Sequence, residues 1–293
     1  MPLPPEPAGG VLYLVGTPIG NLGDLSPRAR QVLAGVAWIA CEDTRHSGLL
    51  LHQLGLRQAG QGPRLVSFHQ HNQSQRIPEL LAALTTGETV ALISDAGLPG
   101  ISDPGEPLVA AAHAAGLPVV CVPGPSAVTT ALVSSGLPTG RFCFEGFLPA
   151  RAGQRRERLE QLGDEERTVV LFEAPHRLLA LLEDLLELLG DRPLRVAREL
   201  TKRHEEQVGP TVQAALDHFR RHPPQGECTL VLGGAPPPPP QAWDAQRLRA
   251  ELQQLIAAGL SSRDAARELA RSSGQNRRAL YALLHGQPPQ DDG

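Results

Sequence analysis

Short apolar runs alternate with helix-like stretches through most of this 293-residue chain, and this alternation limits the possible folds more than any other feature. In the first part of the chain the expected strands are 11–15, 38–41, 64–72, 89–93 and 117–122. Each is followed by a polar loop or a turn and then by a helix-prone segment. Strands and helices that alternate at this spacing form a mostly parallel sheet covered on both faces. The sequence therefore predicts an α/β fold.

The same pattern restarts after Phe147, with expected strands at 168–172, 193–200 and 227–234. We place a domain boundary between about residues 123 and 145, because the loops of the first part end there. The predicted domain plan is a disordered extension at 1–10, α/β domains at 11–123 and 124–235, a proline-rich linker at 236–242, a helical module at 243–285 and a disordered tail at 286–293. The run of prolines in the linker favours a stiff, extended spacer.

Four polar loops follow strands of the predicted sheet: TPIGN at 17–21, EDTR at 42–45, SDAGLPGISDPG at 94–105 and PGPSA at 123–127. In open parallel sheets, ligands bind beyond the carboxyl ends of the strands. Glycines let the backbone approach a ligand and proline fixes the remaining dihedral angles, so such loops are preformed. We expect a ligand site built mainly from these loops.

The residues of these loops narrow the chemical class of the ligand without identifying it. Neither G-x-G-x-x-G before a helix nor G-x-x-x-x-G-K-[ST] occurs, so the usual phosphate cradles are missing from the sequence. The aspartates of 94–105 disfavour a phosphate, and Asp95 is suited to accept hydrogen bonds from ribose hydroxyls or amines. A neutral or cationic ligand such as S-adenosylmethionine is compatible with this chemistry.

Composition gives no sign of a membrane protein or a disulfide-stabilised fold, and any basic surface has to be local. The net charge of −4 lacks the overall basic balance of a nucleic-acid-binding chain, and the sequence contains no apolar run near the roughly 20 residues of a membrane span. The start, MPLPPEPAGG, does not resemble a signal peptide, so we expect a cytoplasmic protein. Four scattered cysteines, expected in the core, indicate neither a zinc site nor a disulfide framework. His69 and His71 lack a third ligand in the sequence, which favours an RNA-facing or solvated role over a metal site.

Six motifs, in this order and spacing, resemble the tetrapyrrole-methylase-like family of S-adenosylmethionine-dependent methyltransferases. They are GTPIGNLGDLSPRA, EDTRHS, SDAGLPGISDPG, PGPSA, FEAPHR and ARELTKRHEE, within about residues 11–235. The first loop has GTPIGN where the porphyrin-modifying branch usually has G-x-G-P-G. The resemblance is therefore to the branch that methylates the 2'-hydroxyl of a cytidine in small-subunit ribosomal RNA. It implies two α/β domains with the cofactor in the cleft between them, and usually a homodimer.

The resemblance also implies residue roles. It places Pro18, Asp95, Ala96, Gly97, Ile101, Ser126, Ala127 and Phe172 beside S-adenosylmethionine, with Phe172 as a wall for the adenine. Pro125-Ser126 before a helix is equally a capping pattern, and the two roles are compatible.

Methyl transfer to a ribose hydroxyl is an in-line displacement that gains most from alignment and further from a group that takes the proton. Lys202 is one catalytic candidate, because a desolvated amine can act as a base. Asp43 is a second, suited to orienting the ribose, and Arg45 a third, suited to holding a phosphate. Other residues of these motifs stay open as alternatives: His176, Arg177, Glu199 and His204.

Two basic segments are candidates for RNA contact. Arg155 and Arg156, with Arg151 and Arg158, form a cluster suited to tracking phosphates or to a solvated helix face paired with glutamates. The second segment, 243–285, has seven arginines and four acidic residues. Its end is typical of a helix-turn-helix, with Ser261 and Asp264 as a capping pair. Its second helix is expected to open with Gln275, Asn276, Arg277 and Arg278, facing RNA or solvent.

Three functions remain distinguishable. A ribose methyltransferase acting on small-subunit ribosomal RNA, free or in the assembled subunit, uses the cofactor loops, the EDTR motif and the basic module together. A small-molecule methylase of the tetrapyrrole type leaves the module without a role. A nucleotide-sensing DNA-binding regulator leaves the loops without a role. The sequence favours the first.

Overall fold

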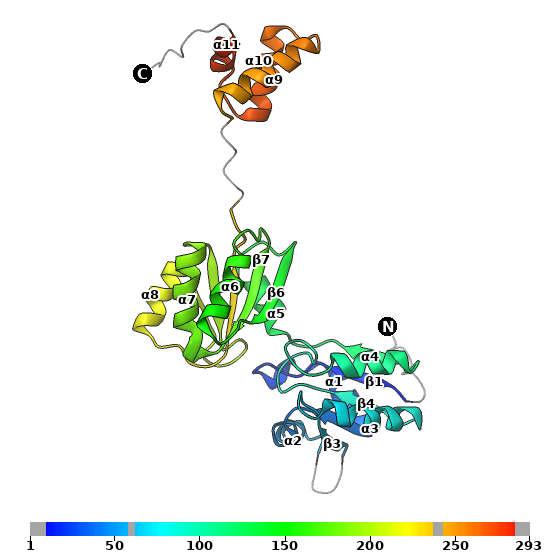
Figure 1. Ribbon diagram of the computed structural model, residues 1–293. Coiled ribbons are helices and arrows are strands. Elements are labelled where there is room, and N and C mark those ends of the chain that lie inside the picture. The colour runs from blue at the N-terminus through cyan, green and yellow to red at the C-terminus, as the bar shows by residue number, and fades with distance from the viewer. Residues whose placement is uncertain (1–9, 58–61, 237–242, 285–293) are drawn as a thin grey trace. The chain divides into compact units, whose positions relative to one another are not determined.

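The structure, a computed structural model, describes residues 10–57, 62–236 and 243–284. Two compact units divide the chain, Met1–Ala235 and Pro236–Gly293. The first unit contains two α/β domains and the second a small helical module (Figure 1). The predictions for residues 1–9, for most of the proline-rich linker and for the tail lie outside the described residues.

The first sheet is entirely parallel, with strand order β3-β2-β4-β1-β5. Its strands are β1 (Leu12–Val15), β2 (Trp38–Cys41), β3 (Arg64–Ser67), β4 (Val90–Leu92) and β5 (Val119–Val122). Alternate residues of β1 enter opposite cores, as strand geometry requires. The connections from β1 and from β4 leave in opposite directions across the sheet, and a ligand crevice is expected at this reversal.

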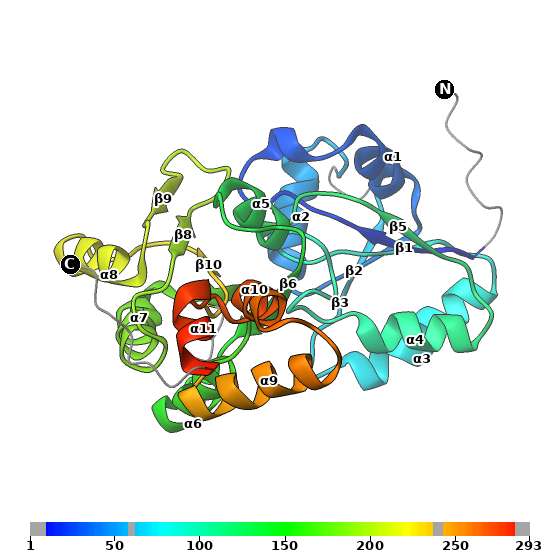
Figure 2. The same cartoon turned by 90° about the horizontal axis from the view of Figure 1, so that it is seen from above.

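Two helix pairs cover this sheet, one on each face (Figure 2). The pairs are α1 (Pro27–Gly35) with α2 (Thr44–Gln53), and α3 (Gln73–Thr85) with α4 (Glu106–Ala114). A short 3-10 helix, η1 (Leu22–Asp24), precedes α1. The predicted start of α1 is confirmed, because Ser26 Oγ accepts a hydrogen bond from the amide of Ala29 at 3.0 Å and Pro27 occupies the first turn.

Two details of the first domain differ from the prediction. Residues 68–72 are not part of β3, so His69 and His71 lie in a loop and not on one face of a strand. The loop after β2 is shorter than expected, since α2 already begins at Thr44 with Asp43 as its N-cap. The cysteine prediction holds for Cys41 and Cys228, which are buried, and is wrong for Cys121, which is exposed.

The second sheet is mixed, with strand order β6-β7-β10-β8-β9. Its strands are β6 (Phe142–Phe147), β7 (Thr168–Glu173), β8 (Leu194–Arg198), β9 (Glu206–Val208) and β10 (Cys228–Leu232). Only β6 and β7 are parallel, because β10 inserts antiparallel between β7 and β8. The sequence prediction had missed the edge strands β6 and β9.

Helices cover the two faces of the second sheet unequally. One face carries α6 (Ala152–Gln161), α7 (Pro175–Leu189) and α8 (Val212–Arg221) around a large apolar core. The other carries α5 (Ala127–Ser134), which packs with Ile19 of the first domain on Val170 and Val231. A single helix leaves part of that face open next to the loops of the first sheet.

The second unit consists of α9 (Ala245–Ala257), α10 (Ser262–Ser273) and α11 (Arg277–Leu284), packed around Leu252, Leu269 and Leu280. The capping pair at α10 is confirmed: Ser261 Oγ accepts from the amide of Asp264 and donates to its carboxylate at 2.6 Å. Within the described ranges, none of the helices is both long and apolar enough to cross a membrane.

Candidate active site

A cavity of about 390 Å³ lies where the loops of the first sheet meet the open face of the second. The loop after β4 contributes 95–98 and 101–103, and the start of α5 contributes 126–128. The second domain contributes 172–175 from the end of β7 and 227–229 from the start of β10. This volume lies within the range of about 300–1,000 Å³ that is usual for small-molecule sites.

Hydrogen bonds between loops fix the floor of the cavity. Thr17 and Gly97 exchange backbone hydrogen bonds of 2.9 and 3.2 Å, and Thr17 Oγ1 donates to the carbonyl of Ser94 at 3.1 Å. Gly97 has φ of +85°, a conformation that a side chain strains, so glycine is required for this turn. The loops after β1 and β4 are therefore held together before any ligand binds.

Most of the residues predicted beside the cofactor line this cavity: Asp95, Ala96, Gly97, Ile101, Ser126, Ala127 and Phe172. Pro18 does not line it. Pro18 is buried, and its neighbour Ile19 forms the wall instead. Ser126 is the N-cap residue of α5 by position, but its side chain makes no capping hydrogen bond, which leaves the hydroxyl available to the cavity.

Four carboxylates line the cavity, from Asp95, Asp103, Glu173 and Glu227, and its walls in the described part of the chain include no lysine, arginine or histidine. Burial raises the pKa of Asp103 to about 6, and the charges of Glu42 and Asp95 act in the same direction against a hydrogen bond from Ser94. Burial likewise raises the pKa of Glu173. Such a lining repels free phosphate and favours a cationic ligand.

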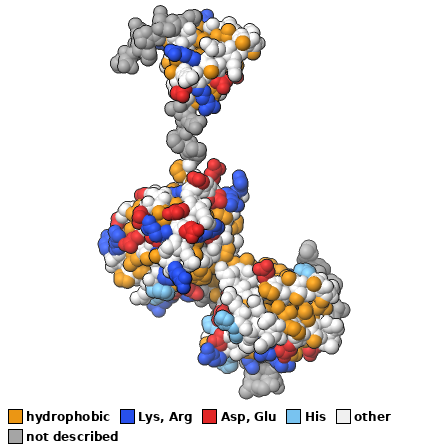
Figure 3. Space-filling model, viewed as in Figure 1, with side chains coloured by type: hydrophobic (Ala, Val, Ile, Leu, Met, Phe, Trp, Pro, Cys, Tyr) orange, Lys and Arg blue, Asp and Glu red, His pale blue; other side chains and the backbone are white. Residues whose placement is uncertain are grey.

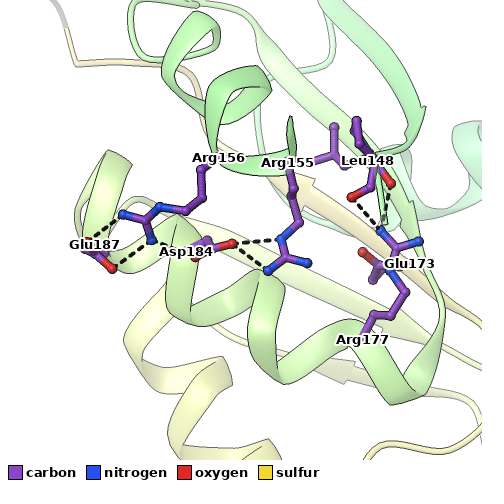
Figure 4. A network of polar contacts seen from close by, with 8 residues as sticks. Leu148, Arg155, Arg156, Glu173, Arg177, Asp184 and Glu187 are labelled. Carbon is purple, nitrogen blue, oxygen red and sulfur yellow. Dashed lines mark hydrogen bonds and ion pairs between the residues drawn. The ribbon is translucent and has the colours of Figure 1, made fainter. Parts of the chain in front are cut away.

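Two of these carboxylates have an oxygen that is buried without a hydrogen-bond partner, Oδ1 of Asp95 and Oε2 of Glu173. The other oxygen of Glu173 accepts from the amide of Ala174 at 2.8 Å and lies 3.1 Å from Arg177 Nε (Figure 4). Arg177 in turn donates to the carbonyl of Leu148 at 2.7 Å, which anchors this wall. Buried polar atoms normally have partners, so unpaired ones in a cavity indicate a ligand that supplies them.

Aromatic rings form the apolar wall. The ring of Phe172 lies 5.0 Å from that of Phe144 and 5.5 Å from that of Phe147, measured between centroids. Phe147 is 55% exposed and stands at the rim. Aromatic rings beside carboxylates fit a nucleoside that carries a positive charge, as S-adenosylmethionine does.

A second cavity, of about 550 Å³, adjoins the first at Asp95, which lines both. Its other residues are 42–45, Ser67, His69 and His71. Asp43 caps α2 by accepting from the amide of Arg45 at 2.8 Å, and it also binds the Arg45 guanidinium through Nε and Nη2. The hydrogen bonds from the Arg45 side chain, and to a smaller extent the one from its amide, hold the pKa of Asp43 far below its usual range. Asp43 and Arg45, both predicted to be catalytic, therefore line the second cavity and not the predicted cofactor site.

Lys202 is held by two carboxylates in the structure. Its Nζ lies 2.7 Å from Glu227 Oε2 and 2.9 Å from Glu199 Oε1. Burial lowers the pKa of Lys202, but the bonds to Glu227 and Glu199 outweigh it and the net shift is upward. The two ion pairs oppose the loss of the proton that a base requires, and a catalytic role for Lys202 stays a prediction. The lysine does adjoin the site, since Glu227 lines the first cavity.

Helix α6 also differs from the prediction. The Arg155 side chain is buried and its guanidinium pairs with Asp184 at 2.7 Å, so the predicted contact of Arg155 with RNA is wrong. Arg156 is held between Asp184 at 2.8 Å and Glu187 at 2.6 Å (Figure 4). Acidic and basic side chains are interspersed on the viewed face of this domain (Figure 3), and a continuous basic stripe is not seen there. These arginines hold α6 to α7.

In the second unit, Gln275 and Asn276 lie in the turn before α11 and not on the helix. Asn276 Oδ1 accepts from the amide of Arg278 at 2.8 Å, so this side chain helps to form the turn. Arg277 and Arg278 are exposed at the start of α11. Within residues 243–284, Arg267 and Arg271 have acidic partners, whereas Arg277 and Arg278 are in no ion pair.

Several lining residues were missed by the sequence prediction. Asp103 was within reach of it, because SDPG belongs to the same motif as Asp95. Glu173 and Glu227 carried a weaker signal. They come together only because β7 and β10 pair antiparallel, with Glu173 opposite Cys228.

Comparison with known proteins agrees with this fold. The profile of the Tetrapyrrole (Corrin/Porphyrin) Methylases matches residues 11–216, and the chain belongs to this family. It is 50% identical over 275 residues to a Synechocystis sp. protein called ribosomal RNA small subunit methyltransferase I, covering 94% of this chain and 97% of that one. A Mesorhizobium japonicum protein of the same name is 43% identical over 284 residues, covering 96% and 94%.

Solved structures are more distant. Uroporphyrin-III C-methyltransferase from Thermus thermophilus has a TM-score of 0.53 and 26% identity, covering 76% of this chain and 94% of that one. A Thermus thermophilus structure of the same name, complexed with S-adenyl homocysteine, has a TM-score of 0.51 and 21% identity, covering 76% of this chain and 97% of that one. At 21% identity the second likeness concerns the fold alone.

Proposed function

We propose that this chain transfers a methyl group from S-adenosylmethionine to the 2'-hydroxyl of a cytidine in small-subunit ribosomal RNA. The observation that carries the proposal is the carboxylate-lined cavity with its unpaired Asp95 oxygen, in a tetrapyrrole methylase whose relatives are called small-subunit ribosomal RNA methyltransferases. The second cavity, with Arg45 at its edge, supplies room for an RNA acceptor beside the cofactor site.

The first cavity fits the cofactor by its chemistry. Phe172 lies against the adenine, the backbone at 95–97 and the hydroxyl of Ser126 hold its polar groups, and the carboxylates balance its positive charges. When bound, S-adenosylmethionine supplies a methyl carbon on a sulfonium sulfur, which leaves as a neutral thioether. The chain contributes a preformed floor, tied by Thr17 and Gly97, that holds this carbon in one place.

In this proposal alignment provides most of the acceleration. Asp95 lines both cavities, accepts a hydrogen bond from the acceptor hydroxyl and takes its proton as the oxygen–carbon bond forms and the carbon–sulfur bond breaks. Arg45, held by Asp43, binds a phosphate next to the acceptor ribose. Lys202 is protonated and keeps Glu227 in position at the cavity wall. Holding the reacting atoms about 3–3.5 Å apart and in line can account for a large part of the rate.

The partners are part of the same proposal. Arg277 and Arg278 of the C-terminal module contact RNA phosphates, since neither is in an ion pair with a carboxylate within residues 243–284. The protein acts in the cytoplasm as a homodimer. Exposed apolar side chains on the second domain, Val133 at 71% and Phe142 at 38%, support a further protein contact. Light scattering of the full chain should give twice the monomer mass.

The test is methyl transfer from radiolabelled S-adenosylmethionine to three acceptors: small ribosomal subunits that lack the modification, the naked RNA, and a tetrapyrrole. Nuclease mapping should place the label on one cytidine 2'-oxygen. Comparison of the first two acceptors decides between the assembled subunit and free RNA. Label on the tetrapyrrole alone, with the cofactor demonstrably bound, contradicts the proposal and favours a small-molecule methylase.

A further inference from the structure

We propose that the second cavity is the acceptor site, which receives one nucleotide turned out of the RNA strand and presents its ribose hydroxyl at Asp95. The proposal rests on the proposed function and adds to it the unstacked state of the acceptor nucleotide and the roles of His69 and His71. It commits to an unstacked nucleotide of single-stranded RNA, because stacking on His71 and a bond from His69 to the base edge both need a base that has left the duplex.

Position is the first argument. The two cavities share Asp95, so a molecule in the second lies directly beside a molecule in the first. The second cavity opens at the ends of β2 and β3, and β2 pairs directly with β4, whose following loop carries Asp95. Its volume of about 550 Å³ suits a ligand of nucleotide size.

Charge is the second argument. The first cavity is lined by carboxylates and has no cationic side chain among its described walls, so it disfavours a phosphodiester. The second has Arg45, His69 and His71 in addition to its acids. Arg45 uses Nε and Nη2 on Asp43, and its Nη1 is in no hydrogen bond within the described parts of the chain. A side chain that is 91% exposed and fixed in direction by a carboxylate is suited to bind a phosphate at the mouth.

The third argument is that the histidine loop is preformed. Asn72 Oδ1 accepts from the amide of His69 at 2.8 Å, while its Nδ2 donates to the carbonyl of Ser67 at 3.1 Å. The amide of Phe68 donates to the carbonyl of Cys41 at 2.7 Å, which ties the loop to β2. The loop therefore holds both imidazoles at the cavity without help from a ligand.

Unpaired atoms indicate where a nucleotide is held. Nδ1 of His69 and Oδ1 of Asp95 are both buried without a hydrogen-bond partner, and both residues line this cavity. His71 is exposed, with its ring centroid 6.0 Å from that of His69. In this arrangement His71 stacks on the base, His69 bonds to its polar edge and Asp95 accepts the ribose hydroxyl.

The experiment compares cavity variants with matched controls in the full-length protein. The variants are Arg45→Ala, His69→Ala, His71→Ala and His71→Phe. The controls are Arg30→Ala and His52→Ala, both exposed in the first domain and outside the two cavities. Each protein is measured for single-turnover methyl transfer to small subunits that lack the modification, and separately for S-adenosylhomocysteine affinity by calorimetry.

The expected result is a loss of about tenfold or more in methyl transfer for the three alanine variants, with S-adenosylhomocysteine affinity unchanged. His71→Phe should recover much of the His71→Ala loss, because it keeps the stacking face. The controls should match the wild type.

Full activity of the three alanine variants would overturn the proposal, as would a parallel loss of cofactor affinity, which would make these residues part of the first site. If the wild type labels only a tetrapyrrole, the proposed function fails and the acceptor site fails with it. The wild-type measurement thus separates a failure of the proposed function from a failure of the acceptor-site proposal alone.

Discussion

The backbones of Gly16 and Gly124 are in contact where the loops after β1 and β5 leave the first sheet. A Cβ added to Gly16 would lie 2.7 Å from the Cα of Gly124, and one added to Gly124 would lie 2.8 Å from the Cα of Gly16. Because backbone is on both sides, neither position can yield by turning a side chain. This contact sets the distance between the loop that carries Thr17 and the loop that carries Ser126.

Gly124→Ala should therefore separate the two loops. We expect a loss of about 1–3 kcal/mol in the free energy of unfolding, as for other overpacked sites, and a weaker affinity for S-adenosylhomocysteine. Chemical denaturation and calorimetry measure the two effects. Gly153→Ala is the control, since a Cβ there meets nothing within 4 Å on helix α6, and it should stabilise the protein by up to about 1 kcal/mol. Equal behaviour of the two variants would contradict the prediction.

Asp103 should make stability depend on pH. Its pKa of about 6 in the folded protein exceeds the ordinary value of 3.8. The folded state thus holds the proton more tightly, and the associated stability is present in full below pH 3.8 and lost as the pH rises through about 6. Asp103→Asn should raise the melting temperature relative to the wild type at pH 8 and have little effect at pH 4. If the two melting temperatures differed by the same amount from pH 4 to pH 8, ionisation of Asp103 would not be the cause of the difference.

The same carboxyl should tune cofactor affinity. Because ionised Asp103 attracts a sulfonium, S-adenosylmethionine should bind more tightly as the pH rises from 5 to 7. S-adenosylhomocysteine, whose sulfur is neutral, should show a smaller dependence. Calorimetric titrations of both ligands across this range provide the comparison, with Asp103→Asn as the control in which the two dependences converge. Parallel curves in the wild type would contradict the prediction.

The cavity floor could be predicted from sequence because it is local. Asp95 and Gly97 directly follow a buried strand, and carboxyl ends of parallel strands meet at one edge of a sheet. The start of α1 was similarly local, since Ser26 and Pro27 are adjacent to the helix that they begin. Sequence spacing is sufficient wherever one strand, one turn and one helix determine the geometry.

Contacts across long separations could not be predicted in this way. Glu227 joins Glu173 at the cavity through an antiparallel pairing whose register no local pattern reveals. The basic face of α6 is compatible with solvent, with phosphates or with carboxylates, and the partner of Arg155 lies 29 residues away on α7. Edge strand β6 was hidden because a register shift between Phe144 and Gly146 interrupts its alternation.

The Arg155–Asp184 pair should stabilise the second domain. Both side chains are nearly buried, at 8% and 11% exposure, so Asp184→Ala leaves a guanidinium without its countercharge. We expect a loss of about 3–5 kcal/mol in the free energy of unfolding. Glu187→Gln, which disturbs only the exposed bond to Arg156, should cost much less. Methyl transfer per folded molecule should be retained in both. A small loss for Asp184→Ala would show that the pair is dispensable.

The arginines at the start of α11 should differ from those of α10 in their effect on RNA binding. Arg277 and Arg278 are in no ion pair within residues 243–284, whereas Arg267 lies 2.7 Å from Asp264 and Arg271 lies 3.6 Å from Glu268. Arg277→Ala combined with Arg278→Ala should reduce the slope of log K against log salt by about 0.7–0.9 for each phosphate that the variant no longer binds. The matched double variant, Arg267→Ala with Arg271→Ala, should keep the wild-type slope. In the wild type these two arginines are already paired with carboxylates. Filter binding to unmodified small subunits at several salt concentrations measures both slopes, and equal slopes would assign the module a role other than phosphate binding.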